Sequence, residues 1–190
     1  VVVGRDTVIY PGTWLEGATV VGEGCEIGPQ ARFQNVRVGS NVTAHFCYAH
    51  ECEIADGATL GPYVHIRPDT KIAAHVKIGN FVEVKNSSVG EGTKLPHLSY
   101  IGDADIGAGV NMGCGTITVN YDGRQKFRTK VGDGAFVGCN SNLVAPVHIG
   151  DNAYIGAGST VTKDVPAGDL AIARARQKNI AGWADKRREQ

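Results

Sequence analysis

Large apolar residues recur every six positions along this chain of 190 residues. The first run is Val3, Ile9, Leu15, Val21, Ile27 and Phe33, and the same frame resumes after one-residue shifts and continues, with interruptions, to Val161. A period of six does not match a helix, but it fits a short strand followed by a turn, used many times. One such unit cannot bury its apolar side alone, so the units must stack on one another.

Three six-residue units per coil build a triangular prism, which is the parallel β-helix that a hexapeptide period indicates. The sequence therefore predicts an all-β fold of about eight coils, which is about 40 Å long at a strand spacing of about 4.8 Å. Glycine makes up 26 of the 190 residues and often follows the apolar position, as in Val21-Gly22, which favours repeated tight turns over disorder. A β-sandwich is the alternative, but it would show two-residue alternation over longer strands.

The repeat is interrupted after Met112 and returns at Val131. The turn signal N-Y-D-G lies in this interval at 120–123, and basic residues follow at 126, 128 and 130. These features predict a loop that projects from the prism near 117–130, and loops on rigid scaffolds often carry function.

The six-residue frame ends after Val165. We therefore expect a repeat domain over 1–168 and a polar tail over 169–190, with a helix as one form that the tail can take. Such a tail would cap the open edge of the last coil. The chain begins at Val1 rather than at a methionine, and it begins within a repeat, so we expect it to be part of a longer protein.

Charge and composition exclude several functional classes. The 19 basic and 19 acidic residues give no net charge, so nucleic acid and anionic membranes are poor default partners. The apolar runs are far too short for a membrane span. The five cysteines show no C-x-x-C spacing, which indicates a reduced, cytoplasmic setting without a structural metal.

The strongest candidate for chemistry is His97, which the repeat places at an outward corner position and which could act as a general base. Arg67 and Lys85 are 18 residues apart, so they should stack on one edge of the prism. Two stacked cations need an acid, for which Glu83 is a candidate, or a bound anion such as phosphate. No G-x-S-x-G elbow is present, so the substrate should supply the nucleophile, and an amine next to a phosphate would fit.

Four segments carry a resemblance to a known family: N-F-V-E-V-K at 80–85, K-L-P-H-L-S-Y-I-G-D-A-D-I-G at 94–107, V-N-M-G-C-G-T-I-T-V-N-Y-D-G at 110–123 and F-V-G-C-N-S-N-L-V-A-P-V at 136–147. Together with the hexapeptide frame, they closely resemble the acetyltransferase domain of the bacterial bifunctional N-acetylglucosamine-1-phosphate uridyltransferases/glucosamine-1-phosphate N-acetyltransferases. The resemblance covers essentially the whole chain. The uridyltransferase domain of that family is absent from this chain, so we expect acetylation alone.

The resemblance implies a left-handed parallel β-helix that assembles as a homotrimer with active sites between subunits. It also implies acetyl transfer from acetyl-CoA to the amino group of glucosamine 1-phosphate. The product would serve the synthesis of UDP-N-acetylglucosamine, a precursor of peptidoglycan and lipopolysaccharide.

The resemblance also assigns roles to individual residues, with His97 as the general base. It places four residues at the sugar phosphate: Arg67, Lys85, Tyr100 and Asn111. It places six residues at acetyl-CoA: Cys114, Asn120, Tyr121, Cys139, Ala157 and Arg174. The family often has alanine or serine at the two cysteine positions, so we expect backbone contacts there rather than thiol chemistry, and no bound metal.

Two other functions remain open at this point. Hexapeptide prisms also form γ-class carbonic anhydrases, in which histidines bind zinc, and His45, His50, His65 and His75 would be the ligands. Zinc would require three imidazoles to converge, and the spacing does not enforce this. A non-catalytic scaffold is the other alternative, but it has no need for His97, Lys85 and the loop asparagine together.

Overall fold

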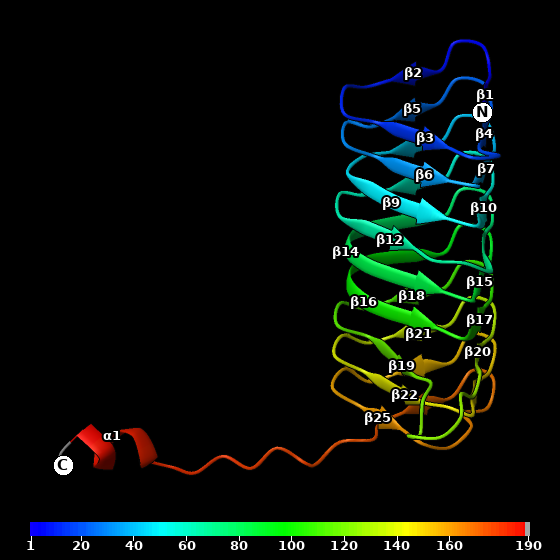
Figure 1. Ribbon diagram of the computed structural model, residues 1–190. Coiled ribbons are helices and arrows are strands. Elements are labelled where there is room, and N and C mark those ends of the chain that lie inside the picture. The colour runs from blue at the N-terminus through cyan, green and yellow to red at the C-terminus, as the bar shows by residue number, and fades with distance from the viewer. Residues whose placement is uncertain (189–190) are drawn as a thin grey trace.

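Short parallel strands stacked into a tall three-sided prism make up nearly all of the computed structural model, which describes residues 1–188 (Figure 1). The first face holds nine strands: β1 (Val2–Val3), β4 (Val20–Val21), β7 (Arg37–Val38), β10 (Cys52–Ile54), β13 (Thr70–Ile72), β15 (Ser88–Val89), β17 (Ala104–Ile106), β20 (Thr129–Val131) and β23 (Val147–Ile149). Each coil adds one strand to this face, so the prism has nine coils rather than the eight predicted.

The other two faces form one continuous sheet of 17 strands. The second face holds β2 (Val8–Ile9), β5 (Glu26–Ile27), β8 (Thr43–Ala44), β11 (Thr59–Leu60), β18 (Asn111–Met112), β21 (Phe136–Val137), β24 (Tyr154–Ile155) and β26 (Leu170–Ala171). The third face holds β3 (Trp14–Glu16), β6 (Arg32–Gln34), β9 (Cys47–His50), β12 (Val64–Ile66), β19 (Ile117–Val119), β22 (Asn142–Val144) and β25 (Thr160–Val161). The strands β14 (Lys77–Lys85) and β16 (Lys94–Gly102) are nine residues long and run across the corner between these faces.

The coil is left-handed. In Figure 1 the chain descends from the N-terminus while it travels leftward at the back, along β2 and β5, and rightward at the front, along β3 and β6. This confirms the handedness that the family resemblance implies.

The core is a set of vertical ladders in which each apolar residue stands on its equivalent in the coil before. The largest fully buried side chains are Phe33, Ile27, Ile54, Leu60, Ile66, Ile72, Ile78, Leu95, Ile101, Met112, Leu143 and Ile149. Small polar residues continue the ladders at the turns. The Thr93 hydroxyl, for example, donates to the Gly107 carbonyl at 2.7 Å and accepts from the Val110 amide at 3.0 Å. These bonds satisfy backbone groups that the turns leave unpaired.

The corner between the second and third faces carries a column of bulky residues in the left-handed backbone region. Phe46, Tyr63, Phe81 and Leu98 have φ angles of 50°, 58°, 59° and 46°. The rings of Tyr63 and Phe81 are parallel with centroids 5.4 Å apart, and Phe46 lies 5.6 Å from Tyr63. We call these four residues the corner column. Bulky side chains are uncommon in this backbone region, so the column stands out from the glycine and asparagine corners elsewhere.

The interruption in the repeat is a hairpin loop, as predicted. It covers residues 120–128, and an antiparallel bridge joins Tyr121 to Lys126. It is shorter at both ends than the expected range of 117–130, because 117–119 and 129–130 pair as strands in β19 and β20. The insertion lengthens one coil, so Met112 pairs with Val137, 25 positions further on.

The tail contains the helix α1 (Trp183–Arg188), so a helix does form there. At the start of the tail, β26 pairs with β24 and extends the second face. The chain then leaves the prism, and α1 has no buried residue (Figure 1). The helix therefore does not cover the last coil, in contrast to the expected cap. Among residues 1–188, none of the helices has the length and hydropathy needed to cross a membrane.

Replacing one buried ladder residue with a smaller one should destabilise the fold, because the coils are stacked without gaps. Leu95 is completely buried, so we expect Leu95→Ala to lower the free energy of unfolding by about 2–5 kcal/mol. Leu170→Ala is the matched control, since that leucine is 63% exposed, and it should change stability by less than about 0.5 kcal/mol. Urea denaturation measures both, and equal shifts in the two variants would contradict the stacked core.

Candidate active site

The first part of the candidate site is a vertical row of residues on the second-face side of the corner. Lys94 pairs with Asn111 and Tyr100 pairs with Ile117, so His97, between them, stands opposite Cys114. The same reasoning from the later pairings places Cys139 next to Cys114 in the following coil, and Ala157 next to Cys139 in the coil after that. We call His97, Cys114, Cys139 and Ala157 the corner row. The stacking of His97 and Cys114 follows from their separation of 17 positions.

His97 is exposed and has a defined orientation. Its Nδ1 lies 2.9 Å from Asn80 Oδ1, and Asn80 pairs with His97 across β14 and β16. Because an amide oxygen only accepts, Nδ1 carries the proton, and Nε2 of the neutral ring keeps its lone pair. The imidazole is thus held by one nitrogen and free to accept a proton at the other.

The second part of the site is a pair of cations on the third face. Arg67 stands opposite Lys85, as the 18-residue spacing predicts, since Ile66 pairs with Val84. Arg67 Nη1 lies 2.8 Å from Glu83 Oε1, so Glu83 is the acid that the sequence suggested. Lys85 Nζ lies 3.7 Å from Asp103 Oδ2. Each cation therefore has one acidic partner and can still contact a ligand.

Asp103 joins the cations to the hairpin loop. Its carboxylate is buried and accepts hydrogen bonds from the side-chain amides of Asn86, at 2.5 Å, and Asn120. Burial acts to raise the pKa of Asp103, but these two amides and the charges of Lys85 and Lys126 together lower it below the ordinary value. Asp103 is consequently a carboxylate near neutral pH.

The loop adds positive charge to the same place. Lys126 lies near Lys85, and the neighbouring positive charge of Lys85 lowers the pKa of Lys126, while Asp103 and Tyr100 act in the opposite direction. Arg128 fixes the base of the loop, because it contacts Asp105 at 2.5 Å and donates to the carbonyls of Asn86 and Ala104, both at 3.2 Å. Crowded cations of this kind favour a bound anion.

Neither Asp103 nor Lys126 is among the site residues that the sequence predicts. The spacing rule that paired Arg67 with Lys85 does not find Asp103, because Lys85 pairs with Gly102, 17 positions on, and Asp103 follows it at the turn. The rule does not apply to Lys126 either, because the loop lies outside the repeat.

Tyr100 and Asn120 lie beside the cations on the third face. The Asn120 side-chain nitrogen is 3.5 Å from the Tyr100 hydroxyl, and Glu83 pairs with Tyr100. Asn120, expected at acetyl-CoA, therefore lies within this single chain among the expected sugar-phosphate contacts.

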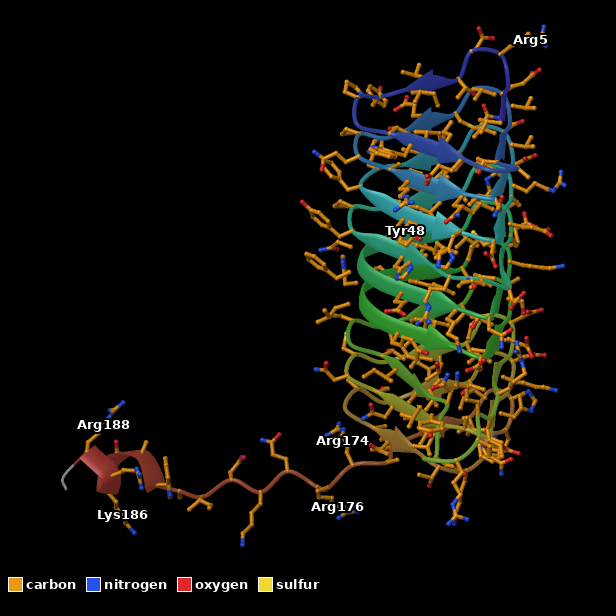
Figure 2. The ribbon with its side chains drawn as sticks, viewed as in Figure 1. Arg5, Tyr48, Arg174, Arg176, Lys186 and Arg188 are labelled. Carbon is orange, nitrogen blue, oxygen red and sulfur yellow. The ribbon has the colours of Figure 1, made fainter. Side chains whose placement is uncertain are left out.

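The remaining predicted residues lie elsewhere. Asn111 pairs with Lys94 and Phe136 on the second face, so it lies on the same side of the corner as His97. Tyr121 is exposed in the loop. Arg174 lies near the Ala157 end of the corner row, at the lower end of the prism in Figure 2, because a Cβ on Gly158 would be 3.6 Å from its Cδ. Within one chain, the predicted site residues therefore lie on two different sides of the corner.

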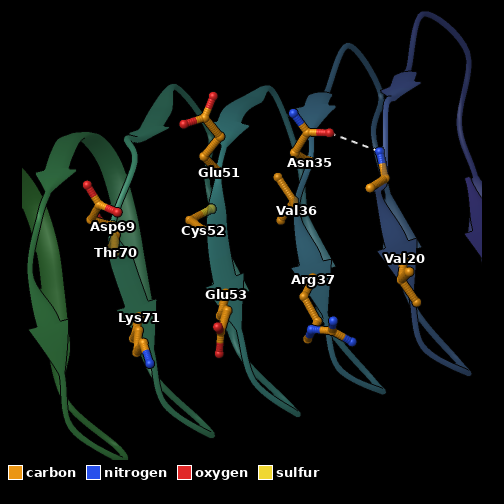
Figure 3. A pocket seen from close by; sticks show the side chains of 11 residues that line it. Val20, Asn35, Val36, Arg37, Glu51, Cys52, Glu53, Asp69, Thr70 and Lys71 are labelled. Atoms are coloured by element: carbon orange, nitrogen blue, oxygen red, sulfur yellow. Dashed lines mark hydrogen bonds between the residues drawn. The ribbon is translucent and has the colours of Figure 1, made fainter.

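A groove runs along the corner on the third-face side. It has a volume of about 450 Å³, and its walls include Tyr63, His65, Phe81, Glu83, Leu98 and Tyr100. It therefore lies between the corner column and the expected sugar-phosphate residues. A separate pocket of about 320 Å³ lies over β4, β7, β10 and β13 on the first face (Figure 3). That pocket contains none of the predicted site residues.

The histidines of the zinc alternative do not converge. His50 and His65 stack with Tyr48, and their ring centroids are 5.7 Å apart. Burial lowers the pKa of His65. The charge of Glu83 acts to raise it, and the charges of His50 and Arg67 act to lower it. His45 lies by Tyr10 instead. In the described part of the chain, 1–188, no group of three or more His, Cys, Asp or Glu side chains is arranged to hold a metal ion.

Comparisons with known proteins agree with the repeat. The model of the bacterial transferase hexapeptide family (six repeats) matches residues 51–86 and 128–163. The chain is 59% identical to the bifunctional protein GlmU of Geobacillus thermodenitrificans over 186 residues, which cover 98% of this chain and 40% of that protein. It is 56% identical to GlmU of Geobacillus sp. WCH70 over 184 residues, which cover 97% of this chain and 40% of that protein. The chain thus spans about 40% of the length of these relatives.

A solved structure shares the fold. The UDP-N-acetylglucosamine acyltransferase of Arabidopsis superposes with a TM-score of 0.60 at 17% identity, covering 87% of this chain and 71% of that one. At this identity the likeness concerns the fold alone.

The lowered pKa of Asp103 predicts a pH-dependent contribution to stability. A lowered folded pKa means that the carboxylate stabilises the fold above the ordinary aspartate pKa of about 4, and that this is lost as the pH falls through the folded value. We expect Asp103→Asn to cost about 1–3 kcal/mol at pH 7, and the difference from wild type to shrink below about pH 4.

Urea denaturation at several pH values measures this difference. Asp6→Asn serves as the control, because Asp6 is exposed in the first coil, and it should change stability by less than about 0.5 kcal/mol throughout. A cost for Asp103→Asn that did not vary with pH would count against the charged network.

Proposed function

We propose that this chain, which belongs with the acetyltransferase domain of the bifunctional GlmU proteins, transfers an acetyl group from acetyl-CoA to the amino group of glucosamine 1-phosphate. The observation that carries the proposal is the coexistence of an oriented imidazole, His97, with a cationic cluster of Arg67, Lys85 and Lys126. The relatives named GlmU at 56–59% identity support the same activity.

The cationic cluster would bind the phosphate of the sugar. Arg67 and Lys85 are each held by one carboxylate, which fixes their positions and leaves other N–H groups free to donate to phosphate oxygens. Tyr100 and Asn120, next to them, would contact the sugar. A neutral chain overall can therefore still present a local anion site.

His97 would act as the general base. Its Nε2 would accept a proton from the amino group as that nitrogen attacks the carbonyl carbon of the thioester. The carbon–nitrogen bond forms, the carbon–sulfur bond breaks, and coenzyme A leaves as the thiol or thiolate. Asn80 would keep the ring in the correct tautomer and orientation.

The corner row would hold acetyl-CoA. Cys114, Cys139 and Ala157 continue the row from His97 through the following coils, so a long ligand lying along the row would end with its thioester at the imidazole. Arg174 and Tyr121 would contact the other parts of acetyl-CoA. Backbone N–H groups near the thioester would stabilise the developing oxyanion, at about 3 kcal/mol per donor.

We further propose that the protein is a cytoplasmic homotrimer with active sites between subunits. Within one chain, His97 and Asn111 are separated from Arg67 and Lys85 by the corner, so a neighbouring copy is needed to join them. The corner column supports contact with a neighbouring copy, because the large side chains of Tyr63, Phe81 and Leu98 are 56–60% exposed in the single chain. The acetylated product would feed the synthesis of UDP-N-acetylglucosamine.

Release of coenzyme A from acetyl-CoA tests the reaction, with glucosamine 1-phosphate and glucosamine 6-phosphate compared as acceptors. His97→Ala should lower kcat about 10²–10⁴-fold, because it removes the base. His148→Ala is the control, since that histidine is exposed on the first face, and its turnover should match wild type. Near-normal turnover in His97→Ala, or equal rates with both acceptors, would refute the assignment.

A further inference from the structure

The five cysteines of the chain fall into two groups. Cys25, Cys47 and Cys52 are buried in the core, and burial raises the pKa of Cys47 and of Cys52 to about 12. Such thiols hardly ionise at neutral pH and react slowly, since the thiolate is the reactive form. Cys114 is half-buried and Cys139 is exposed, so only these two are open to reagents.

The two accessible cysteines are neighbours in the corner row. Met112 pairs with Val137 and Ile117 pairs with Asn142, which places Cys114 directly opposite Cys139. The Asn140 amide donates to the Cys114 carbonyl at 2.7 Å, which continues the pairing through the turn. Their Cα atoms are therefore one strand spacing apart, about 4.8 Å, which lies within the range of about 4.4–6.8 Å for disulfides.

The two side chains also leave the backbone in the same direction. Each cysteine comes directly before a corner residue in the left-handed region, Gly115 with φ 74° after Cys114 and Asn140 with φ 55° after Cys139. Equivalent positions in stacked coils share their orientation, so both thiols point outward, one above the other. Both are present as free thiols in this structure.

We propose that Cys114 and Cys139 form an oxidisable dithiol, which a peroxide converts into a disulfide that obstructs the position expected for acetyl-CoA. The thiolate of one cysteine attacks hydrogen peroxide, the O–O bond breaks, and sulfenic acid and water form. The second thiol then displaces hydroxide from the sulfenic sulfur and gives the S–S bond and a second water. Two electrons and two protons pass from the thiols to the peroxide, so the reaction balances.

The geometry makes this disulfide reversible. Stacked Cβ atoms at the strand spacing of about 4.8 Å must approach to about 3.8 Å for the bond to form. The strain that this introduces, together with exposure, makes a disulfide easier to reduce. Reduction by a thiol would restore the open row.

The effect on activity rests on the proposed function. The bridge would connect the two coils that follow the coil of His97, where the arm of acetyl-CoA is expected to lie. The oxidised protein would then release coenzyme A more slowly than the same protein after reduction.

The test uses the full chain, first reduced and then treated with hydrogen peroxide, with free thiols alkylated before mass analysis. We expect a loss of two thiols and of about 2 Da, a linked pair of peptides containing Cys114 and Cys139, and full reversal by dithiothreitol. Cys114→Ser and Cys139→Ser should each abolish the link.

Cys25→Ser is the matched control and should form the link normally. A serine hydroxyl can make the hydrogen bonds of the Cys25 sulfur, which lies 3.2 Å from the Gly39 carbonyl and 3.4 Å from the Val42 amide. Five intact thiols after peroxide treatment, oxidation of Cys139 alone, or a link between two chains would each overturn the proposal.

Acetyl-CoA separates this inference from the proposed function, since it has no free thiol. At about ten times its Kd, it should slow formation of the link about tenfold if it occupies the row. If the link forms at the same rate with and without acetyl-CoA, the result would support the dithiol and contradict the placement of acetyl-CoA along the corner row.

Discussion

In-register stacking of parallel coils is the constraint on which the rest of this structure depends. Each residue stands on the residue 16 to 18 positions earlier, except across the loop, where the step is 25. Apolar residues thereby form continuous buried ladders, and backbone groups bond from coil to coil. The same rule places polar side chains in vertical rows on the surface. Most of the candidate functional groups are therefore positioned by their step along the repeat, while Asn120 and Lys126 are positioned by the loop.

The corner between the second and third faces carries the residues of the candidate site. On one side, the imidazole of His97 begins a row of small residues. On the other side, Arg67 and Lys85 are held by Glu83 and Asp103. The acids prevent two stacked cations from repelling each other strongly, and the loop adds Lys126 near Lys85. A sugar phosphate and an acyl donor could then approach from opposite sides of one edge.

Much of this could be predicted from the sequence, because the repeat converts spacing into position. The stack of Arg67 on Lys85, the acidic partner Glu83 and the outward corner position of His97 all follow from counting in steps of the coil. Counting in coil steps does not predict the positions of the loop residues. Asn120 follows a strand but lies outside the frame, so its contact with Asp103 depends on how the hairpin folds back.

Other features could not be found from spacing. The continuity of β14 and β16 around the corner depends on single residues, Phe81 and Leu98, in the left-handed backbone region, and apolar residues give no sequence signal for that conformation. The path of the tail away from the prism also has no periodic signal. Turns and chain ends respond to local backbone energies that a six-residue count does not contain.

The central claim is that one chain holds only part of each active site. It is tested most directly by assembling His97→Ala and Arg67→Ala subunits together and measuring coenzyme A release well below the KM of the Arg67→Ala variant. If His97 of one subunit works with Arg67 of the next, random mixing restores about a quarter of the wild-type sites, since one site in four joins two intact halves. Activity no higher than that of the two variants assembled separately would contradict a shared site.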